Sequence, residues 1–105
     1  MGLLDFLRGP NINEGVEEFK ATEGAFLIDV REVDEYKSGH IPGSKNMPLS
    51  RIDNIKNIVK DKNAKVFLYC LSGSRSSQAA GYMKHLGYSD VTNIGGIGRY
   101  TGPLE

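Results

Sequence analysis

Residues 65–86 contain the pattern that most restricts how this chain can fold: a short apolar run that a polar loop joins to a helical repeat. The run over residues 65–70 is rich in β-branched and aromatic residues, which predicts a buried strand. A helix is predicted over residues 76–86, with Gly87 placed to end it, because apolar residues recur there at helical spacing: Ala79, Ala80, Met83 and Leu86. The residues in between must form a tight loop from the end of the strand to the first turn of the helix.

Strand and helix patterns alternate along the rest of the chain as well. The further predicted strands lie at Ile12, at residues 25–30, at residues 44–49 and within residues 88–94. The predicted helices cover residues 14–22 with Asn13 as cap, residues 32–37, and a segment capped by Ser50 with Ile52, Ile55, Ile58 and Val59 on one face. Gly95 and Gly96 are predicted to begin an irregular tail. This alternation predicts an α/β fold with a central, mainly parallel five-stranded sheet flanked by helices on both faces.

Cys70 is the only cysteine, and it lies directly before the predicted loop. Loop N–H groups and the first amides of a helix converge at such a junction and form a cradle for an anion. The helix dipole and the nearby Arg75 lower the pKa of a thiol placed there, so Cys70 is a candidate nucleophile. Gly73 gives the short loop the backbone freedom that it needs. Taken alone, however, a lone cysteine is more often an ordinary buried residue, and Arg75 would then be a solvated charge.

The loop Cys70-Leu71-Ser72-Gly73-Ser74-Arg75-Ser76 resembles the Cys-x-x-Gly-x-Arg-Ser active-site loop of the rhodanese family of sulfurtransferases. Two upstream signatures of that family are matched in order, by Asp29-Val30-Arg31 and by Gly39-His40-Ile41-Pro42-Gly43-Ser44. The resemblance runs from about residue 12 to residue 96. It implies one rhodanese-like domain over residues 12–100, preceded by an N-terminal extension over residues 1–11. Residues 101–105 would be a C-terminal tail, whose last two residues resemble a cloning scar.

The resemblance also implies a chemistry. Cys70 would take sulfane sulfur from thiosulfate or a persulfide, hold it as its own persulfide, and pass it to cyanide, a small thiol or a protein thiol. Arg75 would be the second catalytic residue, and the substrate-binding loop would comprise Leu71, Ser72, Gly73, Ser74 and Ser76. Asp29, Arg31 and His40 would support the site. For Asp29 and Arg31 a local turn with an ion pair is favoured over direct catalysis. His40 is expected to anchor the chain by a hydrogen bond, because a thiolate attacks without a general base.

Composition excludes several other classes of function. Lysine plus arginine equals aspartate plus glutamate at 13 each, so no bulk charge recruits nucleic acid or an anionic membrane. One cysteine excludes an intramolecular disulfide, and the Cys/His spacing of a metal site is absent; neither a metal nor a cofactor is expected. The chain shows no secretory signal and no membrane-spanning stretch, so a cytoplasmic location is predicted. The apolar side chains near the N-terminus are expected to pack on the domain or to contact a partner: Leu3, Leu4, Phe6 and Leu7.

Three alternatives to a sulfurtransferase follow from the same residues. The main one is a noncatalytic sulfur-carrier or regulatory binding module, since a fold does not fix a function. A cysteine phosphatase is disfavoured because its motif places five residues between cysteine and arginine, whereas four separate Cys70 from Arg75. An arsenate reductase would need a second thiol. The chain also lacks the tryptophan that commonly follows the family's Gly-Gly pair; Tyr100 is the candidate to fill its place.

Overall fold

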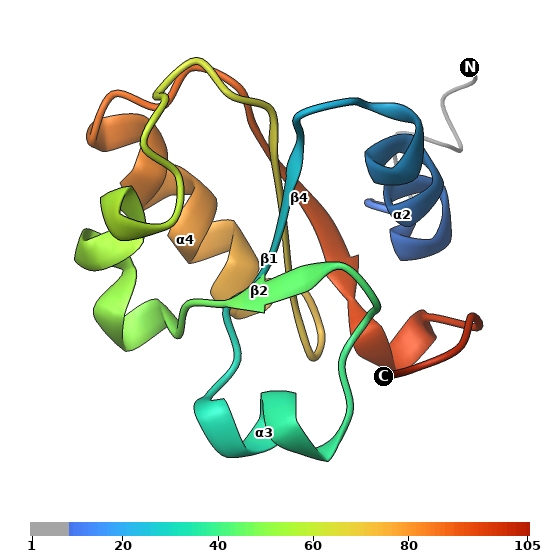
Figure 1. Cartoon of the computed structure of the whole chain (residues 1–105). Coiled ribbons are helices and arrows are strands. Elements are labelled where there is room, and N and C mark those ends of the chain that lie inside the picture. The colour runs from blue at the N-terminus through green and yellow to red at the C-terminus, as the bar shows by residue number, and fades with distance from the viewer. Residues whose placement is uncertain (1–8) are drawn as a thin grey trace.

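A single parallel sheet forms the centre of the protein, in a computed structural model that describes residues 9–105 (Figure 1). The described residues contain four strands, arranged in the order β2-β1-β3-β4. Every neighbouring pair is parallel. The strands are β1 (Phe26–Asp29), β2 (Ser44–Asn46), β3 (Val66–Cys70) and β4 (Val91–Gly96). All five residues of β3 are buried, as expected of a central strand covered on both faces.

Helices cover both faces of this sheet (Figure 1). The covering elements are α2 (Ile12–Ala21) on one face, and α4 (Ser74–His85) with the 3₁₀ segment η1 (Leu49–Asn57) on the other. The helix α3 (Val33–Ser38), which buries none of its residues, and the 3₁₀ segment η2 (Ile97–Arg99) complete the helices of the described residues. On one face α2 packs over a cluster that includes Phe67 and Tyr69 of β3. On the other face α4 and η1 pack over a cluster that includes Leu68 and Cys70. Alternate residues of β3 thus enter two separate cores, and the predicted α/β architecture with a parallel, two-sided sheet is confirmed.

The prediction of a fifth strand at Ile12 is wrong for the residues described. Ile12 begins α2 instead, because the side-chain oxygen of Asn11 accepts hydrogen bonds from the N–H groups of Asn13 and Glu14 and caps the helix. Asn13, the predicted cap, therefore lies inside the helix. Ile12 is only 2% exposed. Its apolar character reflects the packing of the first helical turn against the sheet, which a single position could not distinguish from a strand.

Other boundaries also differ from the prediction. Gly95 and Gly96, expected to open an irregular tail, are the last residues of β4 and pair with Tyr69 and Cys70. The strand predicted over residues 44–49 ends at Asn46. The segment after it is a 3₁₀ helix that follows Pro48 and is interrupted at Arg51, where φ is −121° and ψ is 18°. The helix predicted to begin at residue 76 begins at Ser74.

Within residues 9–105, the helices are all too short or too polar to cross a lipid bilayer. The predicted contacts of Leu3, Leu4, Phe6 and Leu7 lie outside the described residues.

Gly15 lets α2 approach β4 closely, and its replacement tests this packing. A Cβ at position 15 would lie 2.5 Å from Cβ and Cγ2 of Ile94. We expect Gly15→Ala to lower the free energy of unfolding by about 1–3 kcal/mol relative to Gly81→Ala, because overpacking costs that much. Gly81→Ala is the matched control, since a Cβ there meets no atom within 4 Å and both variants gain the helix propensity of alanine. Urea denaturation measures both; equal stabilities would contradict the packing argument.

Candidate active site

Cys70 ends β3, and the chain turns within three residues into α4. Gly73 makes the turn possible, because its φ of 103° lies in the left-handed region that other residues rarely adopt. A Cβ on Gly73 would also lie 3.4 Å from the backbone of Gly95 in β4. The loop that the sequence predicted is therefore a sharp connection pressed against the neighbouring strand.

The sulfur of Cys70 lies in a cradle of hydrogen-bond donors. Its Sγ accepts from the N–H of Gly73 at 3.0 Å and from the N–H of Ser76 at 3.4 Å, and the hydroxyl of Ser76 lies at 3.4 Å. Burial acts to raise the pKa of the Cys70 thiol, but the hydrogen bonds from Ser76, Gly73 and Ser72 outweigh it, so that the pKa lies below its ordinary value. The cradle therefore favours a thiolate.

Cys70 is nevertheless closed off from solvent, with 0% of the residue exposed. The side chain of Leu71, next in the chain, is 53% exposed and lies at the surface. Contact between the sulfur and a small molecule therefore requires the Cys70 side chain or the loop to move.

The far side of the loop rests on the end of β4 and on η2. A Cβ at Gly96 would overlap the carbonyl oxygen of Leu71 and would lie 2.6 Å from Cα of Ser72. The same carbonyl accepts a hydrogen bond of 3.1 Å from the N–H of Gly98. Any side chain at position 96 would thus push the loop away from the sheet.

Arg75 forms an ion pair with Glu35 of α3, in which the guanidinium donates two hydrogen bonds to the carboxylate. Nη1 lies 2.7 Å from Oε1, and Nη2 lies 3.1 Å from Oε2. These bonds lower the pKa of Glu35 to about 2 and raise that of Arg75 above its ordinary value. Glu35 also accepts a bond from the N–H of Glu32 at the start of α3. The positive charge of Arg75 is therefore paired with a carboxylate of α3.

Asp29 and Arg31 form a buried ion pair at the end of β1. Nη2 of Arg31 lies 2.7 Å from Oδ2 of Asp29, and the Arg31 N–H donates to Oδ1 at 2.9 Å. Burial acts to lower the pKa of Arg31, but the bonds and the charge of Asp29 outweigh it and raise that pKa. The same Nη2 donates to the carbonyl of Gly39 at 2.7 Å. The pair thus joins β1 to the segment before β2, as a structural role would require.

His40 lies in that segment, stacked on the ring of Tyr36 with the centroids 3.8 Å apart. Its Nδ1 lies 3.0 Å from the Tyr36 carbonyl, and its Nε2 lies 3.6 Å from the carboxylate of Glu105. Within residues 9–105, no hydrogen bond joins His40, Asp29 or Arg31 to Cys70. Arg31 and His40 instead bond to Gly39 and Tyr36, in and directly after the helix α3 that carries Glu35.

A model of the rhodanese-like domain family matches residues 13–101. The chain belongs to this family. Thiosulfate sulfurtransferase PspE of Escherichia coli (strain K12) is 39% identical over 71 residues, which cover 67% of this chain and 68% of that protein. The putative sulfur carrier protein YrkF of Bacillus subtilis (strain 168) is 36% identical over 95 residues, covering 86% of this chain and 51% of YrkF. A solved structure described as rhodanese with anions from E. coli has a TM-score of 0.72 at 35% identity, covering 77% of this chain and 96% of the other.

Two further residues of this rhodanese domain contact the loop, and neither of them was singled out by the sequence analysis. Glu35 holds Arg75, and Asn93 of β4 bonds to Gly73 and Ser76. The spacing of Glu32 and Glu35 is that of a capping box, which marks Glu35 as the third residue of a helix but does not show its bond to Arg75. Nothing in the sequence around Asn93 marks that residue.

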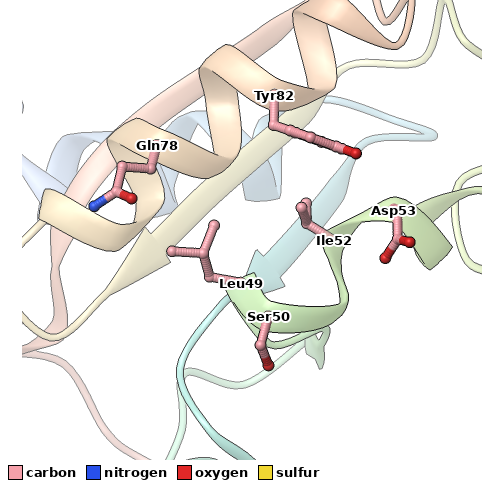
Figure 2. A pocket seen from close by; sticks show the side chains of 6 residues that line it. All are labelled: Leu49, Ser50, Ile52, Asp53, Gln78 and Tyr82. Atoms are coloured by element: carbon pink, nitrogen blue, oxygen red, sulfur yellow. The ribbon is translucent and has the colours of Figure 1, made fainter.

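Tyr100, the candidate to replace the absent tryptophan, follows η2 and is half-buried. It packs against the core cluster on the α2 face of the sheet. A separate hollow of about 390 Å³ lies between η1 and α4 on the other face (Figure 2). Its lining contains none of the predicted site residues; it consists of Leu49, Ser50, Ile52, Asp53, Gln78 and Tyr82. We assign no chemistry to this hollow.

The ion pair between Glu35 and Arg75 predicts how stability depends on pH. Because the pKa of Glu35 falls from 4.5 to about 2 on folding, protonation is harder in the folded protein, and the stabilisation is lost as the pH falls through that range. We expect Glu35→Gln to be less stable than wild type above pH 4.5, with the difference shrinking towards pH 2. Urea denaturation across this range measures it.

Asp34→Asn is the matched control, on the same helix and with the same change of charge. The Asp34 side chain makes no hydrogen bond or ion pair within residues 9–105. A pH-independent difference between Glu35→Gln and wild type would show that the pair does not stabilise the fold.

Proposed function

We propose that this protein is a sulfurtransferase that carries sulfane sulfur as a persulfide on Cys70. The observation that carries the proposal is the arrangement of donors around Sγ: two N–H groups and one hydroxyl lie within hydrogen-bond distance of a fully buried sulfur. The names of the relatives, a thiosulfate sulfurtransferase and a putative sulfur carrier protein, support a role in sulfur transfer or sulfur carriage.

In the first step, the Cys70 thiolate attacks the outer sulfur of the donor. A bond forms between Sγ and that sulfur, and the bond inside the donor breaks; with thiosulfate, sulfite leaves with the electron pair. The negative charge moves from Sγ to the terminal sulfur of the new persulfide. In the second step a nucleophile such as cyanide or a thiolate takes the terminal sulfur, and the electron pair returns to Sγ.

The cradle acts in both steps because it stabilises charge on Sγ. A lower thiol pKa gives more thiolate but a weaker nucleophile, so the first step gains little. The second step gains more, since Cys70 is then the leaving group and a lower pKa makes it leave faster. The donors are fixed by β3, Gly73 and the first turn of α4, so they need no reorganisation as the charge moves.

A noncatalytic sulfur carrier is the second candidate, and the similarity to YrkF favours it. Such a protein would load sulfur on Cys70 with the same chemistry but release it only to a specific protein thiol. Rapid turnover with cyanide or a small thiol distinguishes an enzyme from a carrier.

Cys70→Ser tests the proposal directly. We expect this variant to remain folded but to show neither sulfur loading nor turnover, because a serine hydroxyl is a poor nucleophile at this position. The measurement is the intact mass of the protein after incubation with thiosulfate or a persulfide. Wild type should gain one sulfur atom and lose it on addition of cyanide. Thiocyanate formation by the Cys70→Ser variant would contradict the assignment.

The pairing of Arg75 with Glu35 predicts a preference among donors. The loop residues Leu71, Ser72 and Ser74 carry no charge, so the dianion thiosulfate meets backbone amides and a cation that is already neutralised. We expect a high KM for thiosulfate and faster loading from a less charged persulfide. Glu35→Gln should lower the KM for thiosulfate about two- to fivefold, the size expected of a partly exposed charge, and added salt should reduce the effect.

Steady-state kinetics with both donors measure this prediction, and Asp34→Asn is again the control of equal charge. Saturation of the wild type at micromolar thiosulfate would contradict the inference from charge to donor preference. So would an identical fall in KM for Asp34→Asn, which would indicate a general effect of charge.

A further inference from the structure

The Ser76 hydroxyl has more acceptors than it has protons. Its Oγ lies 2.7 Å from Oδ1 of Asn93, 3.1 Å from the carbonyl of Gly73 and 3.4 Å from Sγ of Cys70. Ser76 is 0% exposed, so water does not supply further partners. A hydroxyl donates one proton, and the three acceptors therefore compete for it.

Asn93 is fixed at this position by the irregularity of β4. The register between β3 and β4 shifts by one residue here, since Leu68 pairs with Asn93 but Tyr69 pairs with Gly95. The Asn93 Oδ1 accepts a bond of 3.0 Å from the N–H of Gly95, and its Nδ2 donates to the carbonyl of Gly73 at 3.1 Å. These bonds orient the amide and leave Oδ1 facing the hydroxyl of Ser76.

We propose that Asn93 is a positioning residue, which holds the Ser76 hydroxyl proton while Cys70 Sγ is uncharged and yields it when Sγ carries negative charge. The assignment follows from the distances. The neutral amide is the nearest acceptor, whereas a charged sulfur is the stronger one, since hydrogen bonds to ionised groups are about twice as strong as neutral ones.

This exchange matches the two steps of sulfur transfer, and in this respect it rests on the proposed function. Sγ is charged before loading, uncharged in the persulfide and charged again after release. A hydroxyl that turns between Asn93 and Sγ supplies one extra donor in the charged states. In the persulfide state, Asn93 keeps the buried hydroxyl bonded.

The test is a double-mutant cycle on the reactivity of the Cys70 thiol. Four proteins are compared: wild type, Asn93→Leu, Ser76→Ala and the double variant. The rate of alkylation by iodoacetamide is followed against pH. The midpoint of the profile reports ionisation, and the plateau at high pH reports access together with the nucleophilicity of the thiolate. The readout requires no sulfur transfer, so loading from thiosulfate, measured in parallel, tests the proposed function separately.

With Ser76 present, Asn93→Leu removes the nearest competing acceptor and leaves only the carbonyl of Gly73 to compete with Sγ, so the midpoint should move to lower pH. Alkylation at a fixed pH below the midpoint should then be about 1.5- to fourfold faster, because the weaker nucleophilicity of a more acidic thiolate offsets about half of the gain from one net hydrogen bond. Ser76→Ala should slow it by a similar factor, and the double variant should match Ser76→Ala alone. The lost bond from Asn93 to Gly73 affects both backgrounds alike and cancels.

Other charged groups near the site do not confuse the comparison. Arg75 of α4 is paired with Glu35 of α3, Asp29 of β1 is paired with Arg31, and β4 carries no ionisable side chain. His40 lies in the segment before β2. All these groups are the same in the four proteins.

An equal effect of Asn93→Leu in the two backgrounds would overturn the proposal, as would an unchanged midpoint or one at higher pH. If Asn93→Leu does not fold, as judged by circular dichroism, Asn93→Asp decides the question. The carboxylate is a stronger acceptor than the amide and should retain the proton of Ser76. Alkylation at a fixed pH should then be slowed more with Ser76 present than in the Ser76→Ala background, and equal slowing would overturn the proposal.

Discussion

Hydrogen bonds from Gly73 and Ser76 to the sulfur of Cys70 replace the water that a buried thiolate would otherwise need. Much of the surrounding structure serves to keep these donors in place. The parallel sheet brings the ends of β1 and β3 to one edge, as is typical of sites in α/β proteins. Gly96 lets the loop lie against β4, and Asn93 ties that strand to the first turn of α4. The donors converge because β3, β4 and α4 together fix the short loop that follows Cys70.

The charged side chains beside the loop are arranged in ion pairs. Arg75 and Asp29 are each paired with a side chain of opposite charge, Glu35 and Arg31, so these two pairs add no net charge beside the loop. Stabilisation of the sulfur therefore comes from hydrogen-bond dipoles, those of the Ser76 hydroxyl and of the N–H groups of the loop, and these are insensitive to salt. A site of this kind suits a reaction in which charge moves between neighbouring sulfur atoms without leaving the loop.

The strand, loop and helix around Cys70 can be predicted from the sequence, because that strand is apolar throughout and the loop matches a family motif. The parallel sheet with helices on both faces can be predicted as well. The prediction failed at Ile12, since one apolar residue has no periodicity and the cap that decides its conformation is the preceding Asn11. Gly95 and Gly96 were misassigned because glycines usually weaken strands, whereas here they allow close approach to the loop. Glu35 and Asn93 act through contacts 40 and 17 residues away along the chain, which no local pattern encodes.

The complete burial of Cys70 links its reactivity to motion of the loop. A sulfur that is 0% exposed meets peroxide, like any donor, only during the fraction of time in which the loop or the side chain has moved. With one cysteine in the chain, no second thiol is present to trap a sulfenic acid as an intramolecular disulfide. The frequency of opening therefore sets an upper limit both on the proposed sulfur uptake and on irreversible oxidation, and a change that makes opening more frequent raises both limits.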